Sequence, residues 1–464
     1  MLLIPKAHLP KKLFYGKFIF LMCFLYILSF IFETMYIEIV YSTVILLVFM
    51  ISLWKANKIL SFFSVGMAIT GIIIIVLKGG GVEELSTGIK VNIPILTLML
   101  LAPLISIPFR LGGYLYPIQA YLIKIYKNSN KFFLLTTIFI FFIGPIMSLG
   151  VIKILHDLIE DFKVNPEFLA KSYLGGYSTV VIWSPYHASV ALVLYYLDVS
   201  IREYFPLALG LSLILLVILN GLYRISKKKQ PDDITLIDHI EGSKHRSHHS
   251  LKRLLILVFF LMGLILSVEY VTKWPMVFIV SLTAILFPLI WSLVKKRIES
   301  TLIEFNKFSE NLAGKSNNEV VLFISAGLLG TALKDTWILE RFHFLLGTIY
   351  EESYFIFMLF IIFIIILFTF IGIHQVVIVT ALLIQIDPET MGTSSVLLAL
   401  LFMLAWSLSA VLSPVNPLNI IVSNLVNRRG IILGAKLNGV YLFLMVLVGC
   451  AYIYILHLFI DGVV

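Results

Sequence analysis

The chain has 464 residues, of which 60% are hydrophobic and only 13% are charged. Soluble domains carry about 25% charged residues, and no water-soluble fold can bury so much apolar surface. The composition therefore excludes a secreted disulfide scaffold, a nucleic-acid-binding module and a soluble enzyme. The formal net charge of +9 is then the excess of Lys and Arg expected in the cytoplasmic loops of a membrane protein.

Apolar runs of membrane-spanning length follow one another along the chain. The predicted crossing helices are 13–32, 35–54, 59–77, 91–109, 178–197, 204–223, 254–271, 274–294, 318–334, 396–425 and 432–456. Two further apolar regions, 132–157 and 354–386, contain Gly, Pro or polar residues in their middle, so we expect two re-entrant hairpins there. The predicted fold class is an all-α polytopic membrane protein with about 11 transmembrane helices plus these hairpins.

The placement of Lys and Arg predicts the orientation. With a cytoplasmic N-terminus, Lys55, Lys58 and the basic linker 224–253 all fall on the cytoplasmic side, as do Arg428 and Arg429. The positive-inside rule then favours an N-in, C-out topology. If either hairpin crossed fully, the later loops would invert and this agreement would be lost. We expect a cell membrane, of the bacterial cytoplasmic type.

A short internal repeat divides the chain. Residues 177–185 read YSTVVIWSP and residues 406–414 read WSLSAVLSP, which pairs Ser184 with Ser413 and Pro185 with Pro414 at an offset of 229 residues. Phe-Ile-Gly ending at Gly144 also matches Phe-Ile-Gly ending at Gly372. An odd number of crossings per half makes the two copies inverted, as in many secondary transporters. The predicted parts are 1–34 with an extra first helix, the repeats 35–225 and 253–464, and the cytoplasmic linker 226–252.

Both repeats contain a helix that a proline should break, 173–197 at Pro185 and 396–425 at Pro414. A proline in a helix interior removes a backbone hydrogen bond, and the freed groups at membrane depth need neighbouring helices, hydroxyls, water or a ligand. Half-helix N-termini suit an anion, and unwound carbonyls suit Na⁺. The predicted solute-binding residues are Ser178, Thr179, Ser184, His187, His374, Gln375, Ser407, Ser413, Asn416 and Asn419. The predicted ion-binding residues are Gly144, Ser148, Gly176, Gly372, Thr380 and Ser409.

These residues carry a family resemblance. The segments GGYSTVVIWSPYHASV (175–190), GIHQVVIV (372–379) and AWSLSAVLSPVNPLNIIV (405–422) resemble the ion transporter superfamily. That group includes divalent-anion/sodium symporters, NhaD-type antiporters, arsenite permeases and TRAP large permeases. The resemblance implies a homodimer with elevator-type movement. The hairpin tips read IGPIMS and IGIHQV instead of the symporters' Ser-Asn-Thr, so the resemblance implies the fold and the place of the site, not the substrate.

The sequence therefore predicts a secondary active transporter, not an enzyme, for a small anionic solute. Na⁺ or H⁺ would drive it, and no cofactor or resident metal is expected. A Na⁺/H⁺ antiporter or a metalloid-ion efflux permease on the same fold is the first alternative. A membrane-embedded enzyme acting on a lipid or polymer precursor, or a lipid flippase, is the second. Besides the solute, the expected partners are the lipid bilayer and a second copy of the chain.

Overall fold

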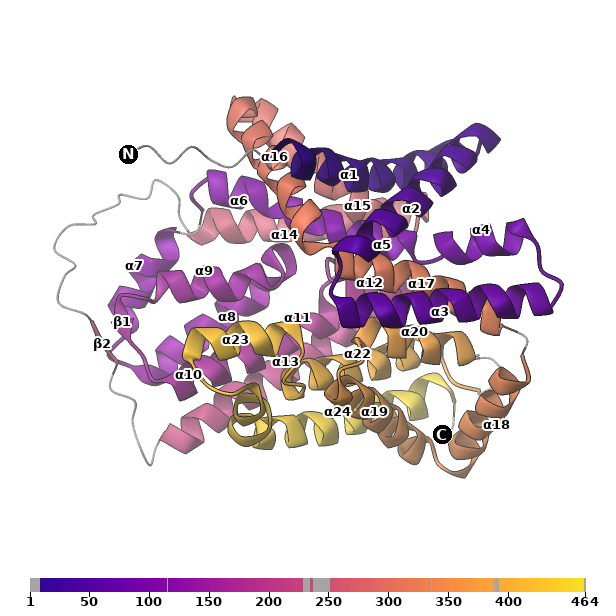
Figure 1. The fold of residues 1–464 in the computed structure, drawn as a ribbon. Helices are drawn as coiled ribbons and strands as arrows, with labels where there is room; N and C mark the ends of the chain where they lie inside the picture. Colours follow the sequence, from indigo (N-terminus) through magenta and orange to yellow (C-terminus); the bar gives the residue numbers. More distant parts are fainter. Residues whose placement is uncertain are drawn as a thin grey trace. The chain divides into compact units, whose positions relative to one another are not determined.

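A computed structural model describes residues 9–114, 116–227, 234–236, 251–334, 336–386, 388 and 392–462 (Figure 1). Most of the predicted basic linker, 226–252, lies outside these residues. Among the described residues, ten segments are long and apolar enough to cross a membrane. The structure thus confirms an all-α, multi-pass membrane protein, while the number of crossings and the N-in, C-out topology stay predictions.

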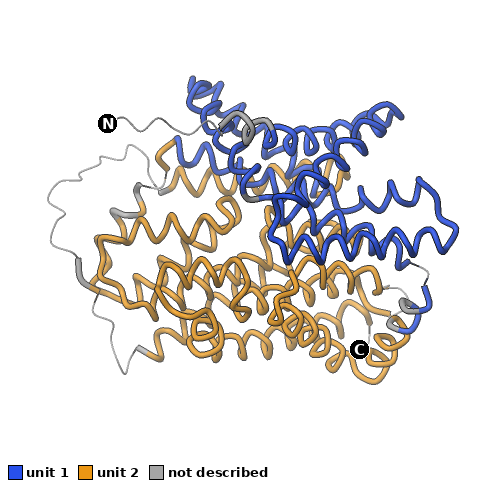
Figure 2. The backbone as a smooth tube through the Cα atoms, viewed as in Figure 1, with its two compact units in different colours: residues 1–111, 277–342 blue, residues 112–276, 343–464 orange. Residues whose placement is uncertain are grey.

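The chain divides into two compact units, shown in different colours in Figure 2. Unit 1 consists of Met1–Leu111 and Val277–Phe342, and unit 2 consists of Gly112–Met276 and His343–Val464. Each unit therefore draws on chain from both sides of the linker. The units do not coincide with the two predicted repeats, because each predicted repeat contributes to both.

Unit 1 is built around a helix that is buried on almost every side. Helix α17 packs against α2, α3, α4 and α5, and its apolar residues face all directions, as expected for a helix inside a bundle. Its centre is tight, since a Cβ added at Gly327 would lie 2.8 Å from the carbonyl oxygen of Gly88 in α4. The elements of unit 1 are α1 (Leu9–Ile31), α2 (Met35–Lys55), α3 (Lys58–Leu77), α4 (Val82–Lys90), α5 (Ile93–Leu101), the 3₁₀ turn η1 (Ala102–Ser106), α6 (Ile107–Leu111), α15 (Met276–Val294), α16 (Ile298–Lys315) and α17 (Asn317–Leu333).

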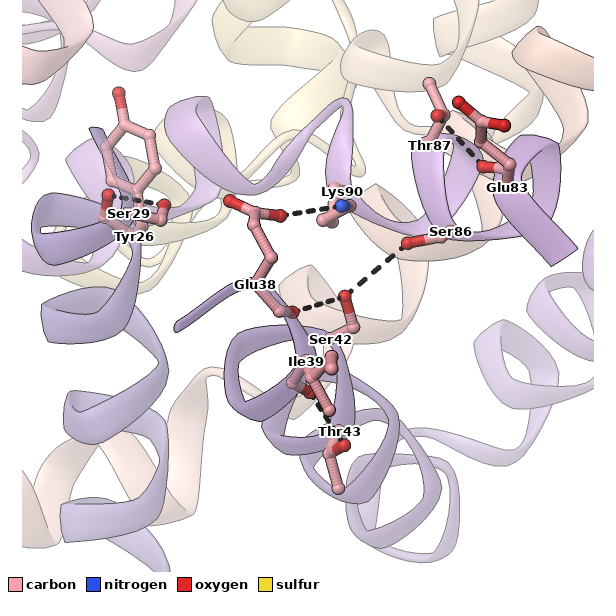
Figure 3. Close-up of polar contacts among 10 residues, drawn as sticks. All are labelled: Tyr26, Ser29, Glu38, Ile39, Ser42, Thr43, Glu83, Ser86, Thr87 and Lys90. Carbon is pink, nitrogen blue, oxygen red and sulfur yellow. Dashed lines mark hydrogen bonds and ion pairs between the residues drawn. The ribbon is translucent and has the colours of Figure 1, made fainter. Parts of the chain in front are cut away.

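Polar contacts join α2 to α4 within unit 1 (Figure 3). The Lys90 ammonium lies 2.8 Å from the Glu38 carboxylate, and the hydroxyls of Ser42 and Ser86 are 3.5 Å apart. The Ser42 hydroxyl also donates to the Glu38 carbonyl oxygen at 2.8 Å. Because Glu38 and Lys90 are both partly exposed, this ion pair orients the two helices and adds little stability.

Unit 2 holds both predicted hairpins and both predicted broken helices. Helix α11 packs against α8, α13 and α22, and α22 packs against α19 and α24. The elements of unit 2 are α7 (Tyr116–Ile125), α8 (Ser129–Met147), α9 (Gly150–Leu158), β1 (Phe162–Lys163), α10 (Pro166–Ala170), the π-turn η2 (Lys171–Gly175), α11 (Gly176–Trp183), α12 (Ala188–Tyr196), α13 (Ile201–Lys227), β2 (Thr235–Leu236), α14 (Leu251–Thr272), α19 (Tyr354–Ile371), α20 (Gln375–Gln385), α22 (Ser395–Leu412), α23 (Pro417–Val426), the π-turn η3 (Ile432–Leu437) and α24 (Gly439–Ile460).

Some elements differ from the predicted pattern. Helix α18 (Trp337–Glu352) forms where no helix was predicted, because its mixed polar and apolar sequence gives no spanning run. The strands β1 and β2 make a short antiparallel pair, Phe162 opposite Leu236. Each predicted hairpin is a helix–turn–helix, but its first arm, α8 or α19, is itself of spanning length.

Candidate functional site

Both predicted breaks are present, and their backbones match. Helix α11 ends at Trp183 and α12 begins at Ala188, while α22 ends at Leu412 and α23 begins at Pro417. Ser184 (φ −75°, ψ 117°) and Ser413 (φ −72°, ψ 121°) leave the helix in the same extended conformation. Pro185 and Pro414 follow them, and a proline cannot continue the hydrogen-bond ladder. A tight turn closes each break.

The hydrogen bonds of the two turns also correspond. The N–H of His187 donates to the Ser184 carbonyl at 3.1 Å, and the N–H of Asn416 donates to the Ser413 carbonyl at 3.2 Å. His187 and Asn416 each stand directly before a new helix, in extended conformation. Helix α12 has no side-chain cap and therefore starts with free backbone N–H groups, which favour negative charge. Helix α23 starts with Pro417, which has no N–H, and the N–H of Leu418 donates to the Asn416 side chain.

The two broken helices touch at residues that the repeat pairs with each other. The Ser407 hydroxyl donates to the Ser178 carbonyl oxygen at 2.6 Å. The Ser178 hydroxyl donates to the Gly175 carbonyl at 2.7 Å and lies 3.1 Å from the Tyr441 hydroxyl of α24. The Thr179 hydroxyl donates to its own helix, and all three hydroxyl side chains are buried. The hydroxyls of Ser178 and Ser407 thus join neighbouring helices, whereas that of Thr179 bonds within α11.

The first hairpin turns at Ser148, the last of the three residues predicted for its tip, Gly144, Pro145 and Ser148. Gly144 and Pro145 lie inside α8, and the turn begins at Ser148, whose φ is +48°. Gly144 instead permits a close approach to α11, since an added Cβ would lie 3.0 Å from a methyl group of Val180.

Gly176 and Gly372 serve their helices in different ways. A Cβ added at Gly176 would lie 3.2 Å from Ile140 of α8, so this glycine belongs to the same tight crossing as Gly144. Gly372 ends α19 with φ +107°, a left-handed conformation that glycine adopts without strain. Gly372 therefore forms the second hairpin turn where it was predicted.

A chain of polar groups links the first hairpin to the first break. The Tyr177 hydroxyl lies 2.8 Å from Nε2 of His187 and 3.5 Å from the Ser148 hydroxyl. Tyr177 is 3% exposed and His187 is 8% exposed. The predicted residues Ser148 and His187 are thereby brought together through a tyrosine that was not predicted.

Four buried polar atoms at the first break have no hydrogen-bond partner in the described part of the chain. They are Nε1 of Trp183, Oγ of Ser184, the hydroxyl of Tyr186 and Nδ1 of His187. Buried polar atoms are normally paired, and leaving one unpaired costs about 1–3 kcal/mol. Helix α20 packs against α12, and the Thr380 hydroxyl of α20 is likewise buried and unpaired. Several buried polar atoms at the first break are therefore available to hydrogen-bond a ligand.

At the second break the chain satisfies most of the polar groups, and the side-chain oxygen of Asn419 is the buried polar atom there that has no partner among the described residues. The Gln375 amide at the start of α20 donates to the Trp406 carbonyl at 2.9 Å and to the Ser409 hydroxyl. The Asn416 amide donates to the Gln375 side-chain oxygen at 2.8 Å, and the Asn416 oxygen accepts from the Leu418 N–H. The Ser413 hydroxyl donates to the Thr369 carbonyl at 2.9 Å.

Asn419 and His374 complete the predicted set. The Asn419 amide donates to the carbonyl oxygens of Val411 and Gly430, which ties α23 to α22 across the break. His374 caps α20, because its Nδ1 accepts from the Val376 N–H at 3.3 Å. Both roles are local, and the structure does not bring His374 together with His187 through any hydrogen bond in the described residues.

Sequence reasoning missed the aromatic members of the site. Tyr177, Trp183, Tyr186 and Tyr441 are absent from the predicted set. Tyr177, Trp183 and Tyr186 nevertheless have buried polar atoms at the first break, and the Tyr441 hydroxyl lies 3.1 Å from that of Ser178. The usable signal was their position, because Trp183 and Tyr186 flank the Ser-Pro pair. Buried Tyr and Trp normally find a hydrogen-bond partner.

The described residues contain no group of three or more His, Cys, Asp or Glu side chains placed to hold a metal ion. No protein-family model and no curated protein sequence matches the chain.

Proposed function

We propose that this chain is a secondary active transporter that moves a small, anionic solute across a cell membrane, driven by Na⁺ or H⁺. The proposal places it with the ion transporter superfamily that it resembles. It includes a homodimer, the bacterial type of cytoplasmic membrane and no enzymatic activity.

The observation that carries the proposal is the contrast between the two breaks. They share one backbone conformation, yet the first leaves Ser184, Tyr186 and His187 with unpaired buried atoms. A solute with several hydrogen-bonding oxygens would satisfy them. The free N–H groups at the start of α12 supply partial positive charge for an anion. We therefore place the solute at the first break.

The second break has no unpaired buried donor among the described residues, because the Gln375 side chain bonds to the polar groups there. Under the repeat offsets, the counterparts of Gln375 and Ser409 in the first half are Met147 and Val180, which cannot form such a network. An amide N–H₂ group donating to a carbonyl and a hydroxyl takes the acceptors that a cation would otherwise use. We therefore propose that any coupling ion also binds near the first break.

The division into units supports an elevator-type movement. Both breaks and both hairpins belong to unit 2, while unit 1 holds helices without such breaks around α17. A unit that contains the whole site can move with its solute as one body. We propose that unit 2 moves and that unit 1 remains fixed.

The test is a double variant, Ser184→Ala with Tyr186→Phe, in the purified full-length chain. Thermal stability is measured against acetate, succinate, phosphate, sulfate and arsenite, each with and without Na⁺, since binding to the folded state raises the midpoint. Uptake of the stabilising solute is then measured in proteoliposomes. Losing two hydrogen bonds should weaken apparent affinity roughly a hundredfold.

Ser325→Ala is the matched control, because it removes a buried hydroxyl from α17 in unit 1. It should leave the solute response intact. A solute response that survives the double variant unchanged would contradict the assignment of the first break. A wild-type chain that responds to no solute in the panel and moves none would contradict transport itself.

The Tyr177–His187 contact favours one variant of this function. A buried imidazole hydrogen-bonded to a hydroxyl chain can carry a proton, which supports H⁺ as the coupling ion or a Na⁺/H⁺ antiporter. Proton flux in vesicles with Na⁺ but without any of the five solutes would favour the antiporter. Proton flux that requires the solute would favour the symporter.

A further inference from the structure

A polar cavity in unit 2 is lined by groups that the proposed transport site does not use, apart from Tyr441, which belongs to both. Its volume is about 230 Å³, and its walls come from the end of α13, the π-turns η2 and η3 and the start of α24. Its polar lining includes Lys171, Lys436 and Asn438, and its apolar lining includes Leu222 and Val440. The proposed transport site uses none of these five residues.

The cavity carries one net positive charge. Each π-turn contributes one lysine, Lys171 from η2 and Lys436 from η3. Lys171 is already paired, since its ammonium lies 2.6 Å from the Glu167 carboxylate. Lys436 is exposed, and no ion pair to it occurs in the part of the chain that the structure describes. The charges of Lys171, Glu167 and Lys436 sum to +1, so a ligand that neutralises them carries a single negative charge.

Asn438 adds a hydrogen-bonding requirement. The side chain is 1% exposed, and its amide donates to the Leu433 carbonyl at 2.8 Å. Its oxygen is buried and has no partner among the described residues. A buried acceptor without a partner requires a hydrogen-bond donor from the ligand. The lysines that line the same cavity attract a negatively charged group. A ligand with both a negative group and a hydroxyl would satisfy both demands.

The apolar side of the cavity continues onto the outer faces of two helices. Val440 is 68% exposed and lines the cavity, and Phe443 lies one turn further along α24 and is 63% exposed. On α13, Leu222 lines the cavity and Val217 is 72% exposed. Large apolar residues exposed on spanning helices contact lipid chains, so this cavity adjoins a surface suited to acyl chains.

We propose that this cavity binds the head group of a phospholipid with one phosphodiester charge and free hydroxyls, the chemistry of phosphatidylglycerol. The phosphodiester lies near Lys436, a head-group hydroxyl donates to Asn438, and the acyl chains follow α13 and α24. Basic pockets between spanning helices are known to hold anionic head groups. A zwitterionic lipid would add its own positive charge to a site where Lys436 is already a positive charge without an ion-pair partner among the described residues. This inference does not depend on the transport proposal.

The experiment compares four probes on the purified full-length chain at equal concentration. The probes are phosphatidylglycerol, phosphatidylcholine, glycerol 3-phosphate and inorganic phosphate, and the readout is the thermal midpoint, with native mass spectrometry to count retained lipids. We expect phosphatidylglycerol alone to raise the midpoint. Lys436→Gln should weaken its apparent affinity roughly fivefold, the value of one lysine near an anionic lipid.

Two further variants make the result decisive. Lys153→Gln removes an exposed lysine from α9 in the same unit and should leave phosphatidylglycerol binding unchanged. Val440→Trp places bulk at an exposed lining position and should reduce lipid retention without harming folding. Equal effects of Lys436→Gln and Lys153→Gln, or equal effects of the two lipids, would overturn the proposal. Equal effects of inorganic phosphate and phosphatidylglycerol would show a free-phosphate site and overturn the lipid assignment.

Discussion

Replacing Gln375 with Met tests whether the hydrogen bonds of the Gln375 side chain hold the second break together. Methionine keeps the length of the side chain and reproduces Met147, the counterpart of Gln375 in the first half. The change removes hydrogen bonds to the Trp406 carbonyl, the Ser409 hydroxyl and the Asn416 amide. Each net bond contributes about 0.5–1.5 kcal/mol, and groups left buried without partners cost more. We expect a loss of about 2–4 kcal/mol in the free energy of unfolding.

The measurement is unfolding of the full-length chain by a denaturing detergent, followed by circular dichroism. Gln385→Met is the matched control, because Gln385 lies in the same helix α20 and its buried side-chain oxygen has no partner in the described residues. It should cost less than about 1 kcal/mol, as most substitutions away from a network do. If Gln375→Met costs no more than Gln385→Met, the network does not hold the second break together and the reasoning fails.

Two further predictions concern packing and capping in unit 2. Gly144→Ala brings a methyl group to 3.0 Å from Val180 and should cost about 1–2 kcal/mol, whereas Gly150→Ala meets nothing within 4 Å and should cost nothing. Asp461→Ala removes the carboxylate that accepts from the Ser394 N–H at the start of α22 and should cost about 1–3 kcal/mol. The same detergent titration measures all three, and a glycine pair with equal effects, or an Asp461 variant as stable as the wild type, would contradict them.

The spanning helices and the two breaks could be predicted because their causes are local. A long apolar run needs no knowledge of its neighbours to be recognised. A proline breaks a helix through its own missing N–H and its own ring, so Pro185 and Pro414 located both breaks correctly. Gly372 likewise marks its turn, because only its left-handed conformation is required.

The hydrogen bonds at the breaks could not be predicted because they depend on tertiary packing. Gln375 and Ser409 are 34 residues apart, and Gln375 and Asn416 are 41 apart. No periodicity in the sequence indicates that these side chains meet. The same limit hid the cavity at Lys436, whose walls come from α8, η2, α13, η3 and α24. The predicted tip of the first hairpin was too wide, because α8 continues through Gly144 and Pro145 to Met147 and the turn begins only at Ser148.

The two breaks show how much of a site the backbone decides. Ser-Pro fixes one conformation twice, to within a few degrees at Ser184 and Ser413. The chemistry then differs because the next residues are Tyr186 and His187 in one break but Val415 and Asn416 in the other. If the backbone alone made a binding site, both breaks would have equal capacity for a solute. Among the described residues, only the first break has unpaired buried donors. The side chains that follow the proline, together with Gln375 of the second hairpin, therefore decide which break binds a solute.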